Sequence, residues 1–459
     1  MPAAMREGGR LVVIGGVAAG LTAASRARRL RRDIEIVVLE KGHDVSYAAC
    51  SLPYYISGVI EKRKSLIVYE ADFFRRERGI DLRLGARATR VSPRARTVDC
   101  GYEDGSEETL SYDALVLATG ATPIVPPFPG SGMPGVFTLR TFAEGDAIKE
   151  FIDSRNPRSA VVVGAGYIGL EMAEALVTRG LEVTVVERLP GVMNTFDPDM
   201  AEIVERELHS NGVRVLTGAG VEAFEPGDDS AAVAYALIDG RRTATDMAIL
   251  SVGVRPRTEL AQEAGLELGA SGAIKVDARQ ITSEASILAA GDCCDTVLTV
   301  TGKRTWIPLG TTANRQGKVA GENAVGGTAR FPGVAGTNIS KVFKLEVAQT
   351  GLTEKAAREE GLRAASATIT ASSRAHGYPS AVPIRVKIVF EKGTAKLLGA
   401  QIIGEEGAAK RIDSVAAGLR SGMTVGELST VDMGYAPPFS PVWDPVLIAA
   451  RQAVKKTGA

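Results

Sequence analysis

The chain has 459 residues, of which 45% are hydrophobic and 24% are charged, and its formal net charge is zero. This length predicts two or three domains, and the balanced charge gives no indication of a surface for nucleic acid or for an anionic membrane. No apolar run approaches the roughly 20 residues that span a bilayer, and residues 1–10 lack the apolar core of a signal peptide. We therefore expect a cytoplasmic protein with no nucleic-acid partner and no membrane partner.

Cysteine and histidine are scarce in this sequence. Four cysteines in a chain of this length form no disulfide framework, and none of the three histidines lies in a cluster with cysteines. Structural and catalytic metal ions are commonly held by such clusters. We therefore expect no metal site, and each isolated cysteine is either a small buried residue or a reactive thiol.

The N-terminal segment predicts a strand, a glycine-rich turn, a helix and a second strand. The strands cover residues 10–15 and 34–40, and the helix covers residues 21–32. Glycines in such a turn let the backbone approach a pyrophosphate, and the acid that ends the second strand binds a ribose. Val17 replaces the middle glycine of the usual pattern, so an ordinary tight turn remains the alternative. The predicted cofactor-binding residues are Gly15, Val17, Ala18, Ala19, Gly20, Glu40 and Lys41.

A second pattern of the same kind is complete. A strand over residues 159–163 leads into a glycine turn, a helix over 170–179 and a strand over 181–187. The acid at its end, Glu187, would bind a ribose and repel a 2′-phosphate, which favours NADH. Arg188 beside it could hold that phosphate, so NADPH stays possible. The predicted cofactor-binding residues here are Gly164, Gly166, Ile168, Gly169 and Glu187.

Two further apolar strands end in small turns, one before and one after the second pattern. They end at Thr119-Gly120 and at Gly291-Asp292, and each alone is as well explained as a plain strand end. Together they predict that a second domain is inserted into the first. The predicted domains are residues 1–148 and 277–335 for the first domain, 149–276 for the second, and 336–459 for a third domain of α+β class.

One cysteine, Cys50, lies between these nucleotide patterns, in the run Ser46-Tyr-Ala-Ala-Cys-Ser-Leu-Pro-Tyr-Tyr55. No second cysteine lies within five residues of it. A thiolate is the form that attacks a disulfide sulfur, so a reactive Cys50 needs a group that stabilises its charge. Lys and Arg are absent from the ten residues around it. We predict that Cys50 is the catalytic thiol, and the alternative is a buried core cysteine.

The patterns together resemble the flavoproteins of the pyridine nucleotide-disulfide oxidoreductase family, which contain two dinucleotide-binding domains. The resemblance rests on residues 15–40, 119–120, 164–187 and 291–292. It implies an α/β fold with two Rossmann-like domains, one for FAD and one for NADH or NADPH, and a C-terminal α+β dimerisation domain. The resemblance also implies cofactor contacts at Thr119, Gly120, Gly291, Asp292, Tyr167, Glu171 and Gly253, with Asp292 on the flavin ribityl chain, Tyr167 over the flavin and Glu171 near the nicotinamide.

Within that family the sequence is most similar to the branch with a single redox cysteine. Tyr55 stands where the two-cysteine members carry their second cysteine. The run around Cys50 resembles the coenzyme A-disulfide reductases most closely. Ala18 stands where peroxidases and many NADH oxidases carry a histidine. The resemblance implies reduction of coenzyme A disulfide or coenzyme A persulfide by NAD(P)H. Polysulfide or persulfide reduction and NADH oxidation are the alternatives, and a flavoprotein reductase for a protein partner is the alternative outside the family.

Coenzyme A carries phosphates, and the resemblance implies that cations bind them. By position, Arg26, Arg29 and Arg78, with Ser46, are similar to the family's contacts for this nucleotide. A solvated, positively charged helix face is the alternative for the arginines.

The C-terminal third resembles the family's dimerisation domain, which implies a homodimer. Tyr435, in a proline-rich and aromatic run, and Tyr378 would then reach the Cys50 site of the partner, where a tyrosine hydroxyl can protonate a leaving thiolate. An aromatic plug in the dimer interface is the alternative role for both.

Overall fold

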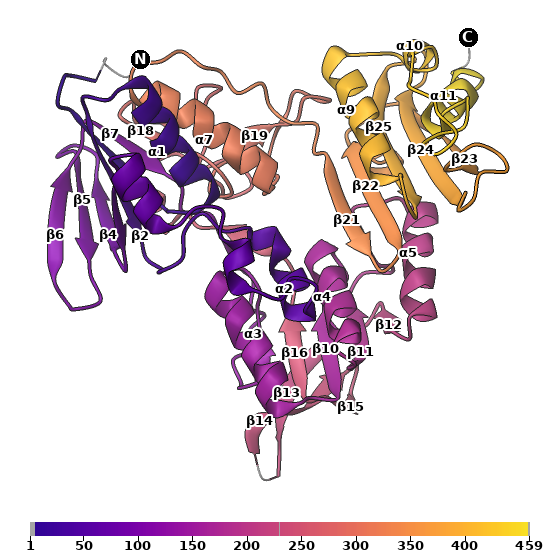
Figure 1. Cartoon of the computed structure of the whole chain (residues 1–459), viewed down its shortest axis with the longest axis horizontal. Coiled ribbons are helices and arrows are strands. Elements are labelled where there is room, and N and C mark those ends of the chain that lie inside the picture. Colours follow the sequence, from indigo (N-terminus) through magenta and orange to yellow (C-terminus); the bar gives the residue numbers. More distant parts are fainter. Residues whose placement is uncertain (1–4, 229, 458–459) are drawn as a thin grey trace.

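The computed structural model describes residues 5–228 and 230–457. Residues 1–4, at the start of the predicted first domain, residue 229, and residues 458 and 459, at the end of the predicted last domain, lie outside the described part. Three five-stranded sheets organise the chain into three domains. Figure 1 shows the first and third domains side by side, with the second below and between them. No described helix is long and apolar enough to cross a membrane.

The first domain is built on a parallel sheet with strand order β3-β2-β1-β7-β18. Alternate residues of β1 point to opposite faces, because the side-chain period of a strand is two. Leu11 and Val13 pack with helices α1 and α7, whereas Val12 and Ile14 pack with the antiparallel strands β4-β5-β6. The bounds are β1 Arg10–Ile14, α1 Ala18–Leu30, β2 Glu35–Glu40, β3 Asp81–Leu84, β4 Arg87–Ser92, β5 Thr97–Gly101, β6 Glu107–Ser111, β7 Ala114–Leu117, β18 Ile287–Ala289 and α7 Gly310–Ala324.

Helices α1 and α7 pack against each other unusually closely. A Cβ atom on Gly317 would lie 2.3 Å from the Ala19 carbonyl oxygen, and one on Gly321 would lie 2.1 Å from that of Ala23. Only glycine fits at these two positions, so the sequence of α7 sets how close the two helices come.

The second domain repeats this architecture with strand order β12-β11-β10-β16-β9. All its neighbouring strands are parallel, and a three-stranded antiparallel sheet, β13-β14-β15, packs on one face. The bounds are β9 Val136–Phe137, α3 Phe142–Arg155, β10 Ser159–Val163, α4 Tyr167–Thr178, β11 Glu182–Glu187, α5 Pro198–Ser210, β12 Arg214–Thr217, β13 Val221–Gly227, β14 Ser230–Ile238, β15 Arg241–Ala244 and β16 Met247–Leu250.

A short antiparallel ribbon joins the first two domains. Strand β8 (Ala121–Pro123) pairs with β17 (Val254–Pro256), and the next strand, β9, already belongs to the second sheet. Ala261 and Leu266, which follow β17, pack in the core of the first domain. We propose this ribbon as the boundary of the inserted domain, in place of the predicted divisions at 148/149 and 276/277. The two-residue strand β9 is too short to be recognised from a hydrophobic pattern. The division at 335/336 stays a prediction.

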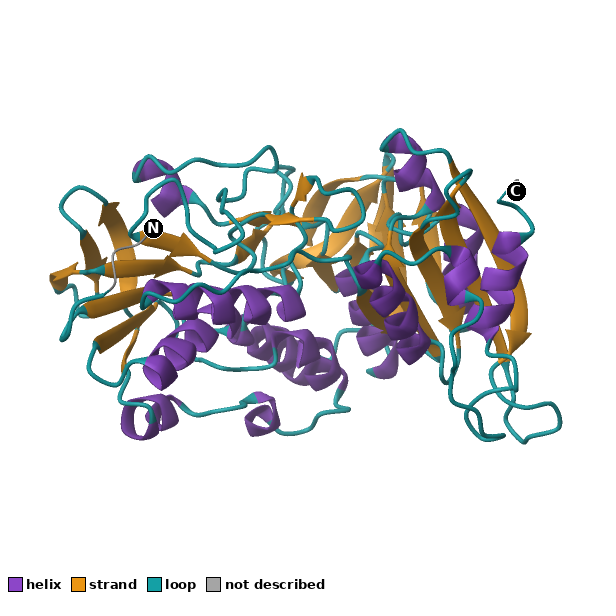
Figure 2. Ribbon diagram, turned by 90° about the horizontal axis from the view of Figure 1, so that it is seen from above, coloured by secondary structure: helices purple, strands orange, loops and turns teal. Residues whose placement is uncertain are grey.

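The third domain is an antiparallel sheet with strand order β21-β22-β25-β24-β23. Helices α9 and α11 cover one face, and the other face meets α4 and α5 of the second domain (Figures 1 and 2). The bounds are β21 Asn338–Val342, β22 Leu345–Gly351, α8 Glu354–Glu359, β23 Ala364–Ser372, β24 Pro383–Glu391, β25 Leu397–Gly404, α9 Ile412–Ser421, α10 Val425–Leu428 and α11 Pro445–Val454. The predicted α/β class with a C-terminal α+β domain is confirmed.

Short elements complete the chain. They are η1 Ala49–Ser51, α2 Leu52–Ser57, η2 Arg63–Leu66, η3 Phe73–Glu77, α6 Glu259–Glu263, β19 Thr296–Val297, β20 Arg304–Thr305 and η4 Ala409–Arg411.

The close contact between α1 and α7 predicts a large effect of one methyl group. Gly321→Ala should lower the free energy of unfolding by about 1–3 kcal/mol, because the two helices must separate to admit the Cβ atom. Chemical denaturation measures the change. Gly310→Ala, in the same helix but with no atom within 4 Å of the new Cβ, is the control. It should leave stability unchanged or raise it by up to about 1 kcal/mol. Equal stability of the two variants would contradict the contact.

Candidate active site

The first glycine loop leaves no room for side chains at two positions. Gly15 has φ +112°, and a Cβ atom on it would lie 2.2 Å from the Ala118 carbonyl oxygen; one on Gly20 would lie 1.8 Å from the Gly15 oxygen. The Glu40 carboxylate accepts hydrogen bonds of 2.7 Å from the Gly16 amide and 2.8 Å from the Gly42 amide. The loop and its acid therefore adopt the arrangement that lets backbone approach a pyrophosphate beside the start of α1.

The ends of β7 and β18 come to the same edge of the sheet. Gly291 has φ +86°, and a Cβ atom on it would lie 2.9 Å from the Ala19 Cβ, at the start of α1. Asp292, directly after it, forms an ion pair of 2.5 Å with Arg140. Gly120, just beyond β7, lies next to the same guanidinium: a Cβ atom on this glycine would lie 3.7 Å from a nitrogen of Arg140. The predicted convergence of residues 119–120 and 291–292 on the first glycine loop is present.

The second glycine loop has the same construction. Gly164 has φ +102°, and a Cβ atom on it would lie 2.6 Å from the Ser251 carbonyl oxygen; one on Gly169 would lie 2.0 Å from the Gly164 oxygen. The Glu187 carboxylate accepts a hydrogen bond of 2.8 Å from the Ala165 amide. Gly253, with φ +116°, follows β16 at the same edge of the sheet. Both loops therefore fit the diphosphate and ribose of a dinucleotide.

The Cys50 loop connects these two sites. The Ser46 amide donates a hydrogen bond of 3.3 Å to the Gly16 carbonyl of the first glycine loop. Cys50 lies in η1, and α2 begins two residues later. Leu52 and Ile56 of α2 are buried in one cluster with Leu170 of α4, the helix that follows the second glycine loop. Cys50 is therefore held at the junction of the two dinucleotide-binding domains.

The surroundings of Cys50 hold its thiol in the protonated form. Loss of water raises the pKa of Cys50, and the carboxylates of Glu171 and Asp292 add to this by repelling a thiolate. Arg140 acts in the opposite direction. Cys50 as a residue is exposed, although its thiol loses enough water for its pKa to rise, whereas Cys100, Cys293 and Cys294 are buried. Cys50 is thus the accessible thiol among the four, and its charge depends on Arg140 and on two neighbouring carboxyl groups.

One face of α4 is bonded to β21 of the third domain. Tyr167 donates a hydrogen bond of 2.5 Å to the Asn338 side chain, and Ser340 donates one of 3.1 Å to Glu171. Burial raises the pKa of Glu171 to about 7, although the Ser340 hydrogen bond opposes the shift. Burial likewise raises the pKa of Tyr167 to about 12. Glu171 thus titrates close to neutrality, beside a thiol.

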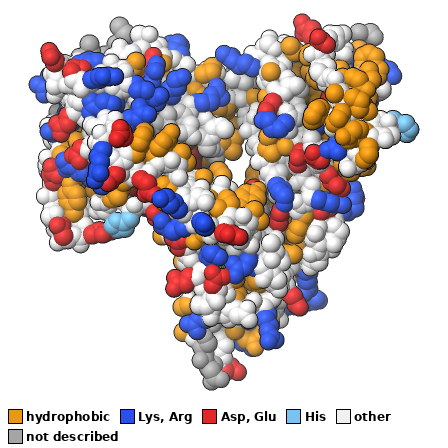
Figure 3. All heavy atoms as spheres, viewed as in Figure 1, with side chains coloured by type: hydrophobic (Ala, Val, Ile, Leu, Met, Phe, Trp, Pro, Cys, Tyr) orange, Lys and Arg blue, Asp and Glu red, His pale blue; other side chains and the backbone are white. Residues whose placement is uncertain are grey.

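Basic side chains gather on the outer side of α1 (Figure 3). A depression there is lined by Arg28, Arg29, Arg32, Ile34, Glu77, Arg78 and Gly79. Two of the predicted substrate residues, Arg29 and Arg78, therefore lie on one surface. The third, Arg26, forms an ion pair of 2.5 Å with Glu322 of α7 and does not line this depression. Arg28 and Arg32 were not among the predicted substrate residues, although they share the helix.

The two predicted tyrosines of the third domain are both exposed. Their loops are joined by a hydrogen bond of 3.3 Å from the Ala375 amide to the Pro437 carbonyl. Within residues 5–228 and 230–457, no hydrogen bond or ring contact joins Tyr378 or Tyr435 to the Cys50 loop of the same chain. Figure 3 shows hydrophobic side chains gathered on this domain. The exposed apolar residues of the Tyr435 loop are Tyr435 itself, Phe439, Val442 and Trp443.

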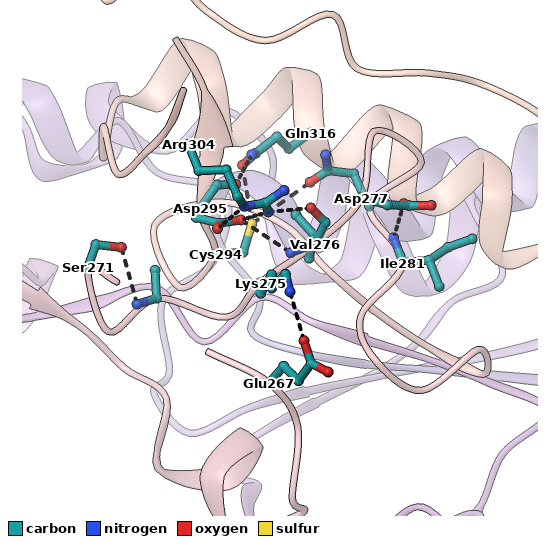
Figure 4. Close-up of polar contacts among 12 residues, drawn as sticks. Glu267, Ser271, Lys275, Val276, Asp277, Ile281, Cys294, Asp295, Arg304 and Gln316 are labelled. Atoms are coloured by element: carbon teal, nitrogen blue, oxygen red, sulfur yellow. Dashed lines mark hydrogen bonds and ion pairs between the residues drawn. The ribbon is translucent and has the colours of Figure 1, made fainter. Parts of the chain in front are cut away.

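Cys294, the second of the two adjacent cysteines after Asp292, belongs to a buried network of polar contacts. Figure 4 shows Cys294 beside Gln316 and Asp295, and the thiol lies 3.6 Å from the Gln316 side-chain oxygen. Burial raises the pKa of Cys294 well above its usual range. Asp295 is ion-paired with Arg304. A buried, protonated thiol of this kind is a packing residue and a poor nucleophile.

Several residues of the site gave no local signal in the sequence. Arg140 and Asn338 lie outside every recognised pattern, and they reach the site only through the tertiary fold. Thr195, which donates a hydrogen bond of 3.2 Å to the Tyr167 hydroxyl, lies in the loop after β11. A search for polar residues just beyond the Glu187 strand end would have found Thr195, but not the other two.

The sequence matches the model of the pyridine nucleotide-disulphide oxidoreductase family over residues 9–317 and that of the family's dimerisation domain over residues 337–445. The chain therefore belongs to this family. The exposed apolar residues Tyr435, Phe439, Val442 and Trp443 lie within the part of the chain that matches the dimerisation domain.

Relatives of similar length have different named activities. A protein named NADH oxidase from Methanocaldococcus jannaschii is 40% identical, over 97% of this chain and 99% of the relative. A CoA-dependent NAD(P)H sulfur oxidoreductase from Pyrococcus furiosus is 40% identical, over 96% and 98%. A coenzyme A disulfide reductase from Staphylococcus haemolyticus is 30% identical, over 94% and 96%. These relatives confirm the predicted similarity to coenzyme A-disulfide reductases.

A solved structure has the same fold throughout. The NAD-dependent persulfide reductase from A. fulgidus superposes with a TM-score of 0.94 and 42% sequence identity, covering 97% of this chain and 83% of that chain.

Removal of the Glu171 charge should change the acidity of the Cys50 thiol. Glu171→Gln should lower the pKa of Cys50, because the neutral amide no longer repels the thiolate. The rate of alkylation of Cys50 as a function of pH, followed by mass spectrometry of its peptide, measures this pKa. Glu182→Gln, an exposed residue of β11, should leave the profile unchanged. An unaltered or raised Cys50 pKa in the Glu171 variant would contradict the arrangement.

Proposed function

We propose that this oxidoreductase uses NAD(P)H and bound FAD to reduce a small disulfide or persulfide, with coenzyme A disulfide or coenzyme A persulfide as the favoured substrate class, and that Cys50 is its redox thiol. The observation that carries the proposal is the position of Cys50: the loop that holds it is hydrogen-bonded to one glycine loop and packed against the helix of the other. A thiol in that place lies where electrons that pass from the second site to a flavin at the first site could reach a sulfur.

The first glycine loop is the proposed FAD site. Its residues fit FAD for two reasons. Gly15 and Gly20 have no space for a side chain, so the backbone can come close to the pyrophosphate, and Glu40 and Asp292 offer carboxylates at the same sheet edge. Bound there, the flavin would supply the route for the two electrons of NAD(P)H to reach a sulfur. We assign Val17, Ala18, Ala19, Lys41, Thr119, Gly120 and Gly291 to the same site.

The second glycine loop is the proposed NAD(P)H site, with Gly164, Gly166, Ile168 and Gly169 at the pyrophosphate. Glu187 accepts one amide hydrogen bond from the loop, and its carboxylate would accept hydrogen bonds from the hydroxyl groups of a ribose, which favours NADH. Tyr167 and Glu171, at the start of α4, would border the nicotinamide half of the dinucleotide. Arg188, directly after the acid, keeps NADPH as a possible donor.

The thiol chemistry follows from the groups around Cys50. Its thiolate attacks one sulfur of the substrate disulfide; a Cys50–sulfur bond forms, the substrate S–S bond breaks, and the other sulfur leaves as a thiolate that takes up a proton. Arg140 favours the attacking thiolate. Glu171, with a pKa of about 7, can hold the proton that the leaving thiolate needs. The mixed disulfide would then be reduced by two electrons and one proton from NAD(P)H, with the flavin as the route; its S–S bond breaks, the second substrate sulfur leaves as a thiol, and Cys50 returns to the thiolate.

The basic depression beside α1 supports the coenzyme A class of substrate. Arg29 and Arg78 line it, and guanidinium groups bind phosphates in a bidentate manner. Ser46 lies on the Cys50 loop, where the pantetheine end of such a substrate would arrive. Arg26, paired with Glu322, is the weakest of the proposed substrate contacts.

We propose further that the protein acts as a homodimer in the cytoplasm. The exposed apolar residues of the dimerisation domain would be buried between two copies. Tyr435 and Tyr378 would then approach Cys50 of the partner subunit, where their hydroxyl groups could orient the leaving sulfur.

The thiol assignment is tested by replacing one atom. Cys50→Ser should keep the bound yellow flavin and its reduction by NADH, and should reduce coenzyme A disulfide only at the background rate. The absorbance of the flavin and the release of free thiol measure the two properties. Cys294→Ser, at a buried thiol, is the control and should retain disulfide reduction. Turnover of coenzyme A disulfide by the Cys50 variant would refute the role of this thiol.

The substrate class is tested at the depression. Arg29→Ala should raise KM for coenzyme A disulfide about tenfold, because one charge-assisted phosphate contact is lost. KM for inorganic polysulfide, which has no phosphate, should stay within about twofold. Arg420→Ala, at an exposed position of α9, is the control. Equal effects on both substrates would argue for the sulfur reductase reading, and faster turnover of oxygen than of either would favour the NADH oxidase reading.

A further inference from the structure

The segment between β11 and α5, residues 188–197, runs past the second glycine loop and contacts it twice. The Met193 amide donates a hydrogen bond of 2.9 Å to the Ala165 carbonyl, and the Thr195 hydroxyl donates one of 3.2 Å to the Tyr167 hydroxyl. Met193 is buried and has φ +47°, which is uncommon for a residue with a side chain. The segment is thus held in one conformation against the loop that binds the dinucleotide.

The far end of this segment is fixed to the third domain. Asp197 is 3% exposed, and its amide donates a hydrogen bond of 2.8 Å to the Gln401 side-chain oxygen. Its carboxylate accepts hydrogen bonds of 2.6 Å from Gln401, 3.1 Å from the Glu354 amide and 3.2 Å from the Lys355 amide. Each of these partners belongs to the dimerisation domain, in β25 or α8.

A buried lysine completes the anchor. The Lys387 side chain, on β24, is 7% exposed, and its ammonium lies 2.8 Å from Asp199, 3.1 Å from Asp197 and 3.6 Å from Glu354. We call these residues, together with Gln401, the Asp197–Lys387 cluster. Burial raises the pKa of Asp197, but the Glu354 amide, Gln401 and Lys387 outweigh it and bring the pKa below its usual range. The carboxylate and the ammonium are therefore both charged at neutral pH.

The cluster is better suited to fixing a position than to adding stability. A buried ion pair contributes little net stability after its groups lose water, but it tolerates few alternative geometries once every group is bonded. A longer ion pair between the same two domains offers the contrast. Lys344 is exposed and lies 4.0 Å from the buried carboxylate of Glu207 in α5 and 3.2 Å from Glu405 of its own domain, so its ammonium keeps its water and the pair contributes little.

We propose that Asp197 and Lys387 are positioning residues for dinucleotide binding: by anchoring residues 188–197 to the dimerisation domain, they hold this segment in the conformation that receives NAD(P)H. The inference rests on the proposed function only in that the second glycine loop binds NAD(P)H. A segment that is ordered before binding loses little conformational freedom when the ligand arrives, whereas a loose segment must be ordered at the expense of affinity.

The test uses the FAD-loaded protein and three variants. In Asp197→Asn/Lys387→Met the two charges are removed together, and asparagine, like aspartate, is favoured at the N-cap position that residue 197 occupies before α5. Its Kd and KM for NADH should rise about tenfold, whereas kcat at saturating NADH stays within about twofold. Amides of residues 188–197 should exchange hydrogen faster. Lys344→Met should change none of these quantities by more than about twofold. Asp199→Asn, at a half-exposed carboxyl of the cluster, should raise the Kd by a smaller factor.

Each outcome separates the anchor from the proposed function. Unchanged Kd and unchanged exchange in the folded double variant would overturn the role of the cluster. Should that variant not fold, Asp199→Asn decides in its place, and its Kd and exchange must exceed those of Lys344→Met. Failure of the unaltered protein to bind NADH would refute the proposed function instead, and faster exchange of residues 188–197 in the variants would still establish the anchor.

Discussion

The packing of α2 against α4 is the contact on which the proposed chemistry depends. Leu52 and Ile56 are almost fully buried in the core of the second domain, although α2 lies in the segment of the chain that forms the first domain. Burying two such side chains contributes roughly 1.5–3 kcal/mol each. Because Cys50 precedes Leu52 by two residues, this contact fixes the thiol at the domain junction. Gly145 of α3 takes part as well, since a Cβ atom there would lie 2.9 Å from Leu52.

The dimerisation domain also supports α4, the helix against which α2 packs. Asn338 and Ser340 bond to Tyr167 and Glu171, so β21 determines where these α4 side chains lie beside the thiol. The Asp197–Lys387 cluster adds a second attachment at α5. One sheet face of the third domain therefore holds α4 and α5 of the second domain in place, while its exposed apolar residues would, in the proposed homodimer, be buried against a second copy.

The sequence predicted what depends on local pattern. Gly20 and Gly169 were recognisable because a tight turn between a strand and a helix requires glycine at a fixed spacing. Cys50 was recognisable because it follows the first pattern closely and has no partner cysteine. The family resemblance implied that Thr119-Gly120 and Gly291-Asp292 contact the same cofactor, and the two segments lie at one sheet edge because β7 and β18 are parallel neighbours.

The remaining features depend on contacts between distant segments. Arg140 meets Asp292, 152 residues further along the chain, and Asp197 meets Gln401 at a separation of 204 residues. Neither Arg140 nor the run Phe196-Asp197-Pro198 belongs to a sequence pattern from which such a distant partner could be predicted. The ion pair between Arg26 and Glu322 has the same origin, because only the packing of α7 on α1 brings these two side chains together.

The central claim is that Cys50 forms a disulfide with a sulfur from outside the chain, and mass spectrometry tests it most directly. The purified protein is incubated with coenzyme A disulfide, digested without reductant and compared before and after addition of NADH. We predict one coenzyme A attached to the peptide that contains Cys50, removed when NADH is added. Attachment at Cys100, Cys293 or Cys294, or an unmodified Cys50 peptide in a protein that still turns over the substrate, would contradict the account.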